Sequence, residues 1–233
     1  MLPRTAVVIP AYNHGATVAD VAARALDLDV PVIVVDDGST DDTRARLCDL
    51  GIRVLRHPRN LGKGAAILTG LAAAREIADW AVTIDADGQH DPADIPDLVR
   101  AIPEGSRPIV VGVRQRMTAA AQVPWASRFG RGFSNFWVRA CGGPALQDSQ
   151  SGLRVYPLPE TLELGVVALR FQFEVEVLVR AGWAGMAVLE APVSVRYPPA
   201  GRRVSHYRPV VDFVRNGRTF TRLLFGRTFG KRP

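Results

Sequence analysis

Cysteines are scarce in this sequence and long apolar runs are missing, and each absence excludes a class of protein. The two cysteines, Cys48 and Cys141, match no metal-ligand spacing, so we expect two reduced thiols in the cytosol. No uninterrupted run reaches the roughly 18 apolar residues that a membrane-spanning helix requires. The segment after Met1 lacks the basic and apolar regions of a signal peptide. We therefore expect a cytosolic protein.

Two common nucleotide-binding signatures are also missing. The residues after the first apolar run, Pro10–Gly15, do not form the Gly-x-Gly-x-x-Gly loop of dinucleotide-binding enzymes. Gly62-Lys63-Gly64 lacks the Ser or Thr that completes a P-loop. No internal repeat or low-complexity linker divides the 233 residues, a length that suits one well-buried α/β domain.

The charge is distributed unevenly along the chain. Between Arg196 and Pro233 there are ten Lys or Arg residues and one acid, Asp212, so this segment carries +9. Because the whole chain carries +6, the remainder carries −3. A slightly acidic body with a basic tail indicates an anionic partner at one end. By charge alone, this partner could be a phosphorylated lipid, a membrane surface or a nucleic acid.

Short β-branched segments alternate with helical segments in the first half of the chain. This alternation is typical of a mostly parallel sheet with helices on both faces. Ligands of such sheets bind beyond the carboxyl ends of the strands, so the loops after Ile9, Val35 and Ile84 should line one crevice. We predict strands over Ala6–Ile9, Val32–Val35, Val54–Leu55, Trp80–Ile84 and Ile109–Gly112, and helices over Thr17–Leu26, from about Thr40, over Lys63–Ile77 and over Asp94–Ile102.

The second half is predicted to contain two basic amphipathic helices. In the helix over Val123–Cys141, aromatic side chains gather on one side and arginines on the other. The aromatic side fits either a lipid surface or the protein core, and both interpretations stay open. The helix over Pro209–Phe225 fits a membrane surface or a docked helix with a solvated edge. The remaining elements are a loop and strand within Leu146–Pro157, a helix over Phe171–Ala181 and a strand over Val188–Tyr197.

Polar clusters follow three of the predicted strands. Adjacent carboxylates repel one another, so a crevice that collects them needs a cation or hydrogen bonds. An Asp-x-Asp sequence after a strand supplies the hard oxygen ligands that Mg²⁺ or Mn²⁺ prefers. Alone, it fits a turn or a helix cap equally well. The clusters are Pro10-Ala11-Tyr12-Asn13, Asp36-Asp37-Gly38-Ser39 and Asp85-Ala86-Asp87-Gly88-Gln89.

Taken in order, these motifs resemble the family 2 glycosyltransferases. Asn60-Leu61-Gly62-Lys63-Gly64 adds a fourth run in register with the three clusters. Within the family, the sequence is most similar to the dolichyl- or polyprenyl-phosphate sugar (mannose or glucose) synthases. Gln147-Asp148-Ser149-Gln150-Ser151-Gly152 looks like a further motif of that subgroup, with Ser151 in place of the usual Cys.

The resemblance implies a glycosyltransferase A fold, with a Rossmann-like, mostly parallel sheet, and a GDP- or UDP-sugar donor. It implies a nucleotide-sugar and metal half over about 1–112, an acceptor half over about 113–208 and a basic helix and tail over about 209–233. A Mg²⁺ or Mn²⁺ ion would neutralise the leaving nucleoside diphosphate. The implied metal ligands are Asp85, Asp87 and Gln89, and the implied donor residues are Pro10, Ala11, Tyr12, Asn13, Asp37, Lys63, Asp85, Ala86, Arg202 and Ser205.

The implied acceptor is a polyprenyl phosphate or another lipid at the cytosolic face of the membrane, where the protein would bind peripherally. Asp87 and Asp148 are the implied catalytic residues, and Asp148 would activate or orient the acceptor. A phosphate acceptor is already ionised and needs little base catalysis, whereas an alcohol would need Asp148 as a base. The arginines expected at the acceptor are Arg114, Arg128 and Arg131. Related synthases often carry Ser-Lys where this chain has Ser205-His206, so a role for His206 stays open.

Three alternatives compete with this interpretation. The transferred sugar could go to a hydroxyl of another lipid or of a small molecule. Asp85–Gly88 also resembles the Asp-x-Asp-Gly of a dehalogenase-type phosphatase, although that motif is usually on the first strand and followed by Thr. A membrane-docking module without enzymatic activity would explain the basic tail but not the three acidic clusters. We expect no nucleic-acid partner, and the oligomeric state is open.

Overall fold

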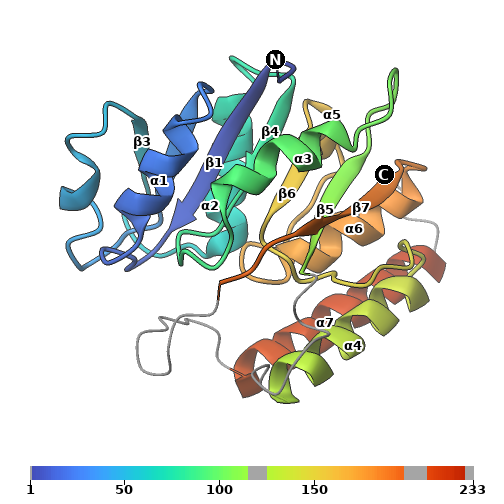
Figure 1. Cartoon of the computed structure of the whole chain (residues 1–233). Helices are drawn as coiled ribbons and strands as arrows, with labels where there is room; N and C mark the ends of the chain where they lie inside the picture. The colour runs from blue at the N-terminus through green and yellow to red at the C-terminus, as the bar shows by residue number, and fades with distance from the viewer. Residues whose placement is uncertain (1, 115–124, 197–208, 229–233) are drawn as a thin grey trace.

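The computed structural model describes residues 2–114, 125–196 and 209–228, with the side chains of 125–129, 209–213 and 227–228 excepted. Within these residues, seven strands form one sheet in the order β3-β2-β1-β4-β6-β5-β7 (Figure 1). β6 is antiparallel to both of its neighbours, and the other pairs are parallel, so the predicted mostly parallel sheet is confirmed. The strands are β1 (Thr5–Ala11), β2 (Val32–Asp36), β3 (Arg53–Arg56), β4 (Trp80–Thr83), β5 (Ile109–Arg114), β6 (Arg154–Pro157) and β7 (Val188–Val193).

The central strands are buried on both faces because apolar side chains occupy most of their positions. Along β1, Ala6 and Val8 point into one core, and Val7 and Ile9 point into the other. This follows from the period of two in a strand, where successive side chains lie on opposite faces. A continuous apolar run is therefore what a strand between two helical layers requires.

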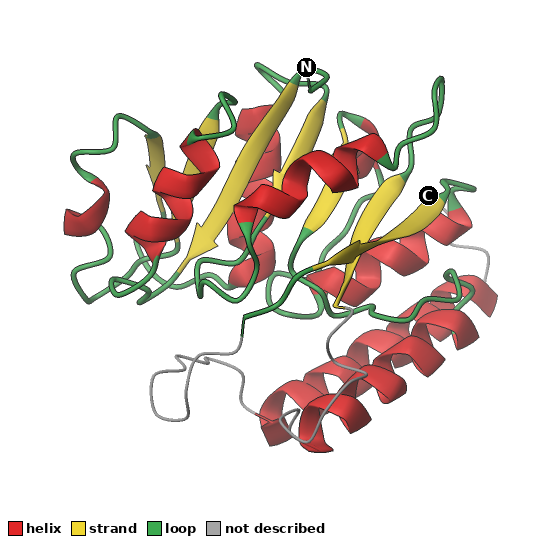
Figure 2. Ribbon diagram, in the orientation of Figure 1, coloured by secondary structure: helices red, strands yellow, loops and turns green. Residues whose placement is uncertain are grey.

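Helices cover both faces of the sheet, as predicted (Figure 2). α1 and α3 pack on one face, and α2 and α6 pack on the other. α4 and α7 lie side by side and pack outward on α6, beyond the sheet (Figure 1). The helices are α1 (Val18–Leu26), α2 (Lys63–Ala74), α3 (Ile95–Arg100), α4 (Trp125–Ala140), α5 (Glu160–Glu163), α6 (Phe173–Trp183) and α7 (Pro209–Thr228), with 3-10 turns η1 (Ala45–Leu47) and η2 (Pro92–Asp94).

The helix predicted from about Thr40 is wrong. The segment forms a loop, and only the short turn η1 follows it. Polar side chains divert its backbone groups from a helix: Ser39 N–H donates to Asp36 Oδ1, and Thr43 N–H donates to Asp41 Oδ1 at 3.0 Å. Such local side-chain bonds compete with helical hydrogen bonds. These polar residues therefore hold a loop in place of the predicted helix.

The aromatic side of α4 is mainly part of the core. Trp137 stacks on Phe220 of α7 with ring centroids 6.0 Å apart, and Phe133 meets the same ring edge-on. Phe136, however, is 64% exposed. None of the helices in the described residues combines the length and the apolarity needed to cross a bilayer.

The strand order indicates a ligand-binding crevice at the carboxyl ends of β1 and β4. From β1 the chain runs outward through β2 and β3, then returns to add β4 on the other side of β1. Such a reversal of strand order leaves an opening between the loops of the two strands, where α/β proteins bind ligands. The predicted polar clusters follow β1, β2 and β4, so the fold brings them to this opening.

Candidate active site

Asn13 closes the loop after β1 onto the loop after β2. Its φ of 54° lies in the left-handed region, which asparagine tolerates better than most residues. Its Oδ1 accepts a hydrogen bond from Thr40 N–H at 2.8 Å, and its own N–H donates to Ser39 Oγ at 2.9 Å. The loops therefore form one wall of the crevice. Three other predicted donor residues lie in this wall or at its base: Pro10 and Ala11, which are buried, and Tyr12, which is half-buried.

Asp37 fastens the segment that leads into α2. Its Oδ1 accepts hydrogen bonds from His57 Nδ1 at 2.7 Å and from Leu61 N–H at 2.9 Å. Its Oδ2 accepts from Gly62 N–H at 2.8 Å, and only 2% of the residue is exposed. The carboxylate thus shapes the floor of the crevice. Its role as a ribose or base ligand stays a prediction.

Asp85 follows β4 and carries the charge at the centre of the crevice. Its Oδ1 lies 2.7 Å from Lys63 Nζ. Burial alone would raise the pKa of Asp85, but the Lys63 ammonium outweighs burial and lowers it. Gly152 packs directly against the carboxylate: a Cβ there would lie 2.1 Å from Asp85 Oδ2. The site therefore holds an ionised carboxylate that needs a glycine beside it.

Asp87 and Gln89 form a local pair two residues beyond Asp85. Asp87 accepts hydrogen bonds from Gln89 N–H at 2.9 Å and from Gln89 Nε2 at 2.7 Å. The glutamine thereby orients the Asp87 carboxylate. The predicted donor residue Ala86, between the two aspartates, is buried and accepts a hydrogen bond from Thr17 Oγ1 through its carbonyl.

The donor set fits a divalent cation that is shared with a substrate. No cluster of three or more His, Cys, Asp or Glu side chains suited to a metal occurs in the described residues. Asp85 and Asp87 each supply hard carboxylate oxygens after β4. Mg²⁺ is commonly held by one or two carboxylates together with substrate phosphates, so two carboxylates suffice for that mode of binding.

His90 is a buried residue beside the candidate site that was not predicted from the sequence. It is 4% exposed, and its Nδ1 has no hydrogen-bond partner. Burial lowers the pKa of His90 to about 4, although Asp85 opposes this shift. An isolated antiparallel bridge to Val195 fixes its backbone, and β7 ends at Val193, short of the predicted Tyr197. A neutral imidazole therefore lies in the electrostatic field of Asp85, Arg114 and Asp148.

Asp148 and Arg114 form a buried ion pair. The guanidinium of Arg114, at the end of β5, donates from Nε to Asp148 Oδ2 at 2.5 Å and from Nη2 to Oδ1 at 2.8 Å. Asp148 is fully buried, and the Arg114 side chain is 16% exposed. Two parallel bonds fix the plane of a guanidinium. Both residues were predicted to serve the acceptor, and the structure brings them together.

Residues from α4 and β7 hold the loop that carries Asp148. Asn135 Nδ2 donates to Gln147 O at 2.8 Å, and Asn135 Oδ1 accepts from Ser149 N–H at 3.0 Å. Glu190 Oε1 accepts from the backbone N–H groups of Gln147 and Asp148. Glu190 was not predicted from the sequence, because a single acid in a strand carries no signal of the loop that it contacts. The loop is thus held from two sides.

The remaining predicted residues are only partly placed. Arg131 lies on α4 and is half-buried. Arg128 lies on the same helix, but its side chain is outside the described part of the structure. Arg202, Ser205 and His206 lie outside the described residues.

Comparisons with known proteins agree with these features. Residues 6–152 match the family described as glycosyl transferase family 2. A UDP-N-acetylglucosamine–dolichyl-phosphate N-acetylglucosaminyltransferase of Methanococcus voltae is 31% identical over 213 residues, which covers 82% of this chain and 85% of that protein. A polyprenol monophosphomannose synthase of Mycolicibacterium smegmatis is 28% identical over 211 residues, which covers 82% of this chain and 77% of that protein.

A solved structure with bound ligands is also similar. Glucosyl-3-phosphoglycerate synthase of Mycobacterium tuberculosis, in complex with Mn²⁺, uridine diphosphate and glucosyl-3-phosphoglycerate, superposes with a TM-score of 0.70 at 25% identity. The match covers 97% of this chain and 80% of that one. The structural similarity therefore extends over nearly the whole chain, including the loops that carry Asp85 and Asp148.

Proposed function

Since the chain belongs to glycosyl transferase family 2, we propose that it transfers a hexose from a UDP- or GDP-sugar to a polyprenyl phosphate, with inversion at the anomeric carbon. The chain is a glycosyltransferase with the glycosyltransferase A fold, as the sequence predicted. The donor, the acceptor, the need for a metal and the membrane location are parts of the proposal.

The contact between Gly152 and Asp85 is the observation that supports the proposal best. Gly152 belongs to the loop that carries Asp148, and its backbone lies against the carboxylate that follows β4. A donor phosphate at Asp85 would thus adjoin the loop that positions Arg114. Proximity of the two reactants is a large part of the catalysis of group transfer.

On the donor side, Asp85 and Asp87 would hold a Mg²⁺ or Mn²⁺ ion, with Gln89 orienting Asp87. When bound, the ion would neutralise charge that develops on the leaving nucleoside diphosphate. The loops after β1 and β2, which Asn13 joins by hydrogen bonds, would border the nucleotide. Lys63, 2.7 Å from Asp85, would place a further cation beside the donor phosphates.

On the acceptor side, Arg114 would bind the lipid phosphate and Asp148 would orient Arg114. Because both Asp148 oxygens accept hydrogen bonds from Arg114, the carboxylate is poorly placed to take a proton from an alcohol. A phosphate acceptor is ionised at neutral pH and needs no such base. The buried pair therefore favours an oxyanion that attacks the anomeric carbon in a single displacement and releases the nucleoside diphosphate.

A second candidate acceptor is a small phosphorylated molecule with a hydroxyl group. The similar Mycobacterium tuberculosis structure contains glucosyl-3-phosphoglycerate, in which glucose is joined to a phosphoglycerate. Arg114 would then bind the phosphate of the acceptor, while another group would have to accept the proton of the hydroxyl. An acceptor panel separates these two candidates directly.

We further propose that the protein binds the cytosolic face of an anionic membrane through α4 and α7. Both helices expose apolar side chains: Phe136 is 64%, Phe225 is 59% and Val214 is 49% exposed. Arg139 and Arg218 on the same helices are also exposed. Apolar and basic side chains together are what an interfacial helix uses to bind anionic lipid.

The first experiment measures release of nucleoside diphosphate from a panel of UDP- and GDP-sugars with Mn²⁺ or Mg²⁺. Polyprenyl phosphate, polyprenol and 3-phosphoglycerate are supplied separately as acceptors, and Asp87→Ala serves as the inactive control. We expect release that requires metal and polyprenyl phosphate and is lost in the variant. Release with polyprenol or phosphoglycerate alone would contradict the lipid-phosphate acceptor. Absence of binding to every nucleotide sugar would contradict the donor site.

A further inference from the structure

Three charged side chains from distant parts of the chain meet beside the donor site. Lys63 is the first residue of α2, Asp85 follows β4, and Glu174 lies in the first turn of α6. Lys63 Nζ lies 2.7 Å from Asp85 Oδ1 and 2.6 Å from Glu174 Oε1. The three side chains are mostly buried, with 16%, 24% and 9% of their surfaces exposed in that order. One cation thus serves two carboxylates.

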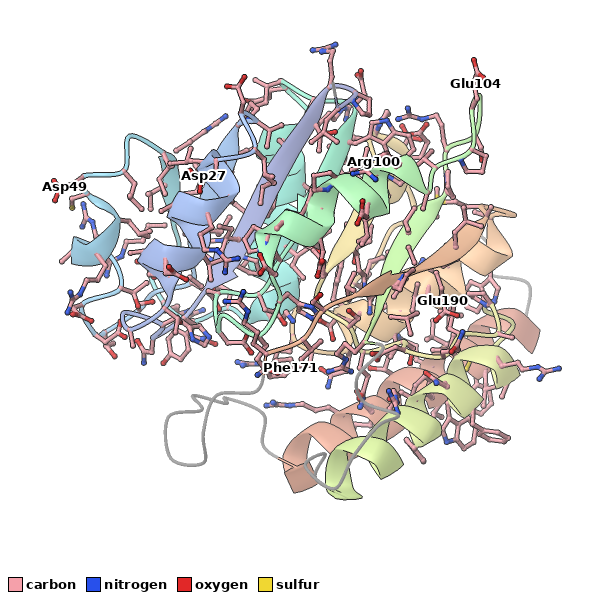
Figure 3. All side chains as sticks on the ribbon, viewed as in Figure 1. Asp27, Asp49, Arg100, Glu104, Phe171 and Glu190 are labelled. Carbon is pink, nitrogen blue, oxygen red and sulfur yellow. The ribbon has the colours of Figure 1, made fainter. Side chains whose placement is uncertain are left out.

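The backbone around the cluster fixes the position of Lys63. Gly62 has a φ of 113°, and a Cβ there would lie 2.3 Å from the carbonyl oxygen of Leu169. The same oxygen accepts a hydrogen bond from Ala65 N–H at 2.9 Å. The start of α2 is therefore locked to the segment before α6. Phe171 of that segment lies at the sheet edge where the parallel strands end (Figure 3), and its ring centroid is 5.9 Å from Lys63 Nζ.

The charges of the cluster bear directly on cation binding at Asp85. A lysine hydrogen-bonded to Asp85 competes with a divalent ion for that carboxylate and repels the ion. Glu174 pairs with the same ammonium as Asp85 and offsets its charge. An ion bound at Asp85 would therefore meet a Lys63–Glu174 pair whose net charge is close to zero. Burial raises the pKa of Glu174, and the Lys63 ammonium opposes that shift. Without Lys63, Glu174 would be a buried and unpaired carboxyl group.

We infer that Glu174 is a positioning residue of the donor site, which holds the Lys63 ammonium and offsets its charge so that a divalent cation can bind at Asp85. The inference rests on the proposed function, since it assumes that a metal binds with the donor. It adds a residue 111 positions from Lys63 in the chain. It also gives Lys63 an electrostatic task that is distinct from contact with the nucleotide.

The test is a double-mutant cycle that removes the two charges singly and together, with Mn²⁺ affinity as the measured quantity. Mn²⁺ binding is titrated by the paramagnetic resonance of free Mn²⁺, with UDP and with GDP, for wild type, Glu174→Gln, Lys63→Met and the double variant. Removing the Glu174 charge should weaken Mn²⁺ binding about tenfold, because Lys63 then repels the ion unopposed. Lys63→Met should tighten binding by a similar factor, and the double variant should return close to the wild-type affinity. Glu163→Gln, at an exposed position on α5, should match wild type.

The outcomes separate this inference from the proposed function. Thermal unfolding of each variant checks folding, and the double variant leaves no uncompensated charge at either position. Equal Mn²⁺ affinity in wild type and Glu174→Gln would overturn the inference, while the wild-type metal and nucleotide site would still stand. Loss of nucleotide binding in Lys63→Met, with metal affinity unchanged, would make Lys63 a donor ligand and would also overturn it. Failure of the wild type to bind Mn²⁺ with either nucleotide would overturn both proposals.

Discussion

At the scale of single residues, the acceptor side of the crevice depends on buried charges that are fully hydrogen-bonded. Arg154 is the clearest case, since it is completely buried and donates to three backbone carbonyls. Two of them, Ser149 O and Ser151 O, belong to the loop that carries Asp148, and the third, Glu174 O, belongs to α6. A buried guanidinium is stable only when its donors are satisfied. Arg154 therefore joins the loop that carries Asp148 to α6, the helix whose Glu174 pairs with Lys63.

Asp148→Asn should weaken use of the acceptor and leave donor binding intact. An amide cannot accept both guanidinium bonds, so Arg114 would lose its fixed plane. We expect kcat/KM for polyprenyl phosphate to fall about 100-fold, as misplaced substrate-binding groups do. Steady-state kinetics at varied acceptor concentration, with separate calorimetry of nucleotide binding, measure both effects.

Arg114→Lys supplies the matched control for that prediction. The two residues act as a unit, so the double variant Asp148→Asn/Arg114→Lys should lose little more than either single variant. A full additive loss would mean that Asp148 acts independently of Arg114. Such a result, together with the disappearance of an acid limb from the pH profile, would support Asp148 as a base.

Gly152→Ala should damage the donor site through a steric contact. The new methyl group would lie 2.1 Å from Asp85 Oδ2, so the carboxylate has to move. We expect metal-dependent nucleotide binding to weaken at least about tenfold, since a displaced ligand loses its geometry. Gly217→Ala, on α7, meets no atom within 4 Å and should bind nucleotide normally. Unchanged binding in Gly152→Ala would show that Asp85 is not needed there.

The sequence predicted candidate site residues from motif spacing, but it did not predict their partners. Asp85, Asp87 and Asp148 carry chemistry in motifs with fixed spacing, and motif spacing is readable along a chain. Lys63 and Glu174 are far apart in sequence, and only the packing of α2 against α6 joins them. An acid within the apolar helix over Phe171–Ala181 was the one available signal, because buried acids are nearly always paired.

At the scale of elements, the strands were predicted best because their apolar runs are continuous. The sequence Phe173-Glu174-Val175-Glu176-Val177 alternates like a half-buried strand, yet it forms the helix that was predicted there. Glu176 is completely buried and accepts from Arg180 and from Arg222 of α7. Arg222 therefore fastens α7 to α6.

Arg107 fastens the segment before β5 to the ends of β4 and β6. It donates to the carbonyls of Asp79 and Leu158, pairs with Glu160 and covers the Trp80 ring at 4.8 Å. Arg107→Ala should lower the free energy of unfolding by about 1–2 kcal/mol, since the carbonyls lose a charged donor. Urea denaturation at pH 7 measures the difference.

The pH dependence of that difference has a defined sign. The hydrogen bond from Arg107 lowers the pKa of Glu160 from its ordinary 4.5. A lowered folded-state pKa stabilises the fold above the unfolded value, and this contribution is lost as the pH falls through the folded-state value. The gap between wild type and Arg107→Ala should therefore shrink below about pH 4.5. A gap that widens on acidification would contradict the pairing.

At the scale of the whole molecule, the two halves of the chain share one sheet and one crevice. β5 lies at the junction of the two predicted halves and pairs with β7 of the predicted acceptor half, and β6 joins β5 to β4 of the predicted donor half. The sequence predicted the uneven charge and the alternation of strands and helices. The packing of α4 against α7 outside the sheet could not be predicted from the sequence. An amphipathic pattern shows that a helix has an apolar face, but it does not show which surface that face packs against.

That helix pair supports the last prediction, which concerns membrane binding. Phe136→Ser/Phe225→Ser should bind vesicles of phosphatidylglycerol about tenfold more weakly in co-sedimentation, because two exposed apolar side chains no longer enter the lipid. Leu26→Ser removes an exposed apolar side chain from α1, on the other side of the molecule, and should bind vesicles like wild type (Figure 1). Added salt should weaken the binding of wild type, since the exposed arginines contribute through screened charges. Because the substituted residues lie outside the crevice, nucleotide binding should stay unchanged. Equal vesicle binding by all three proteins would exclude α4 and α7 as the docking surface.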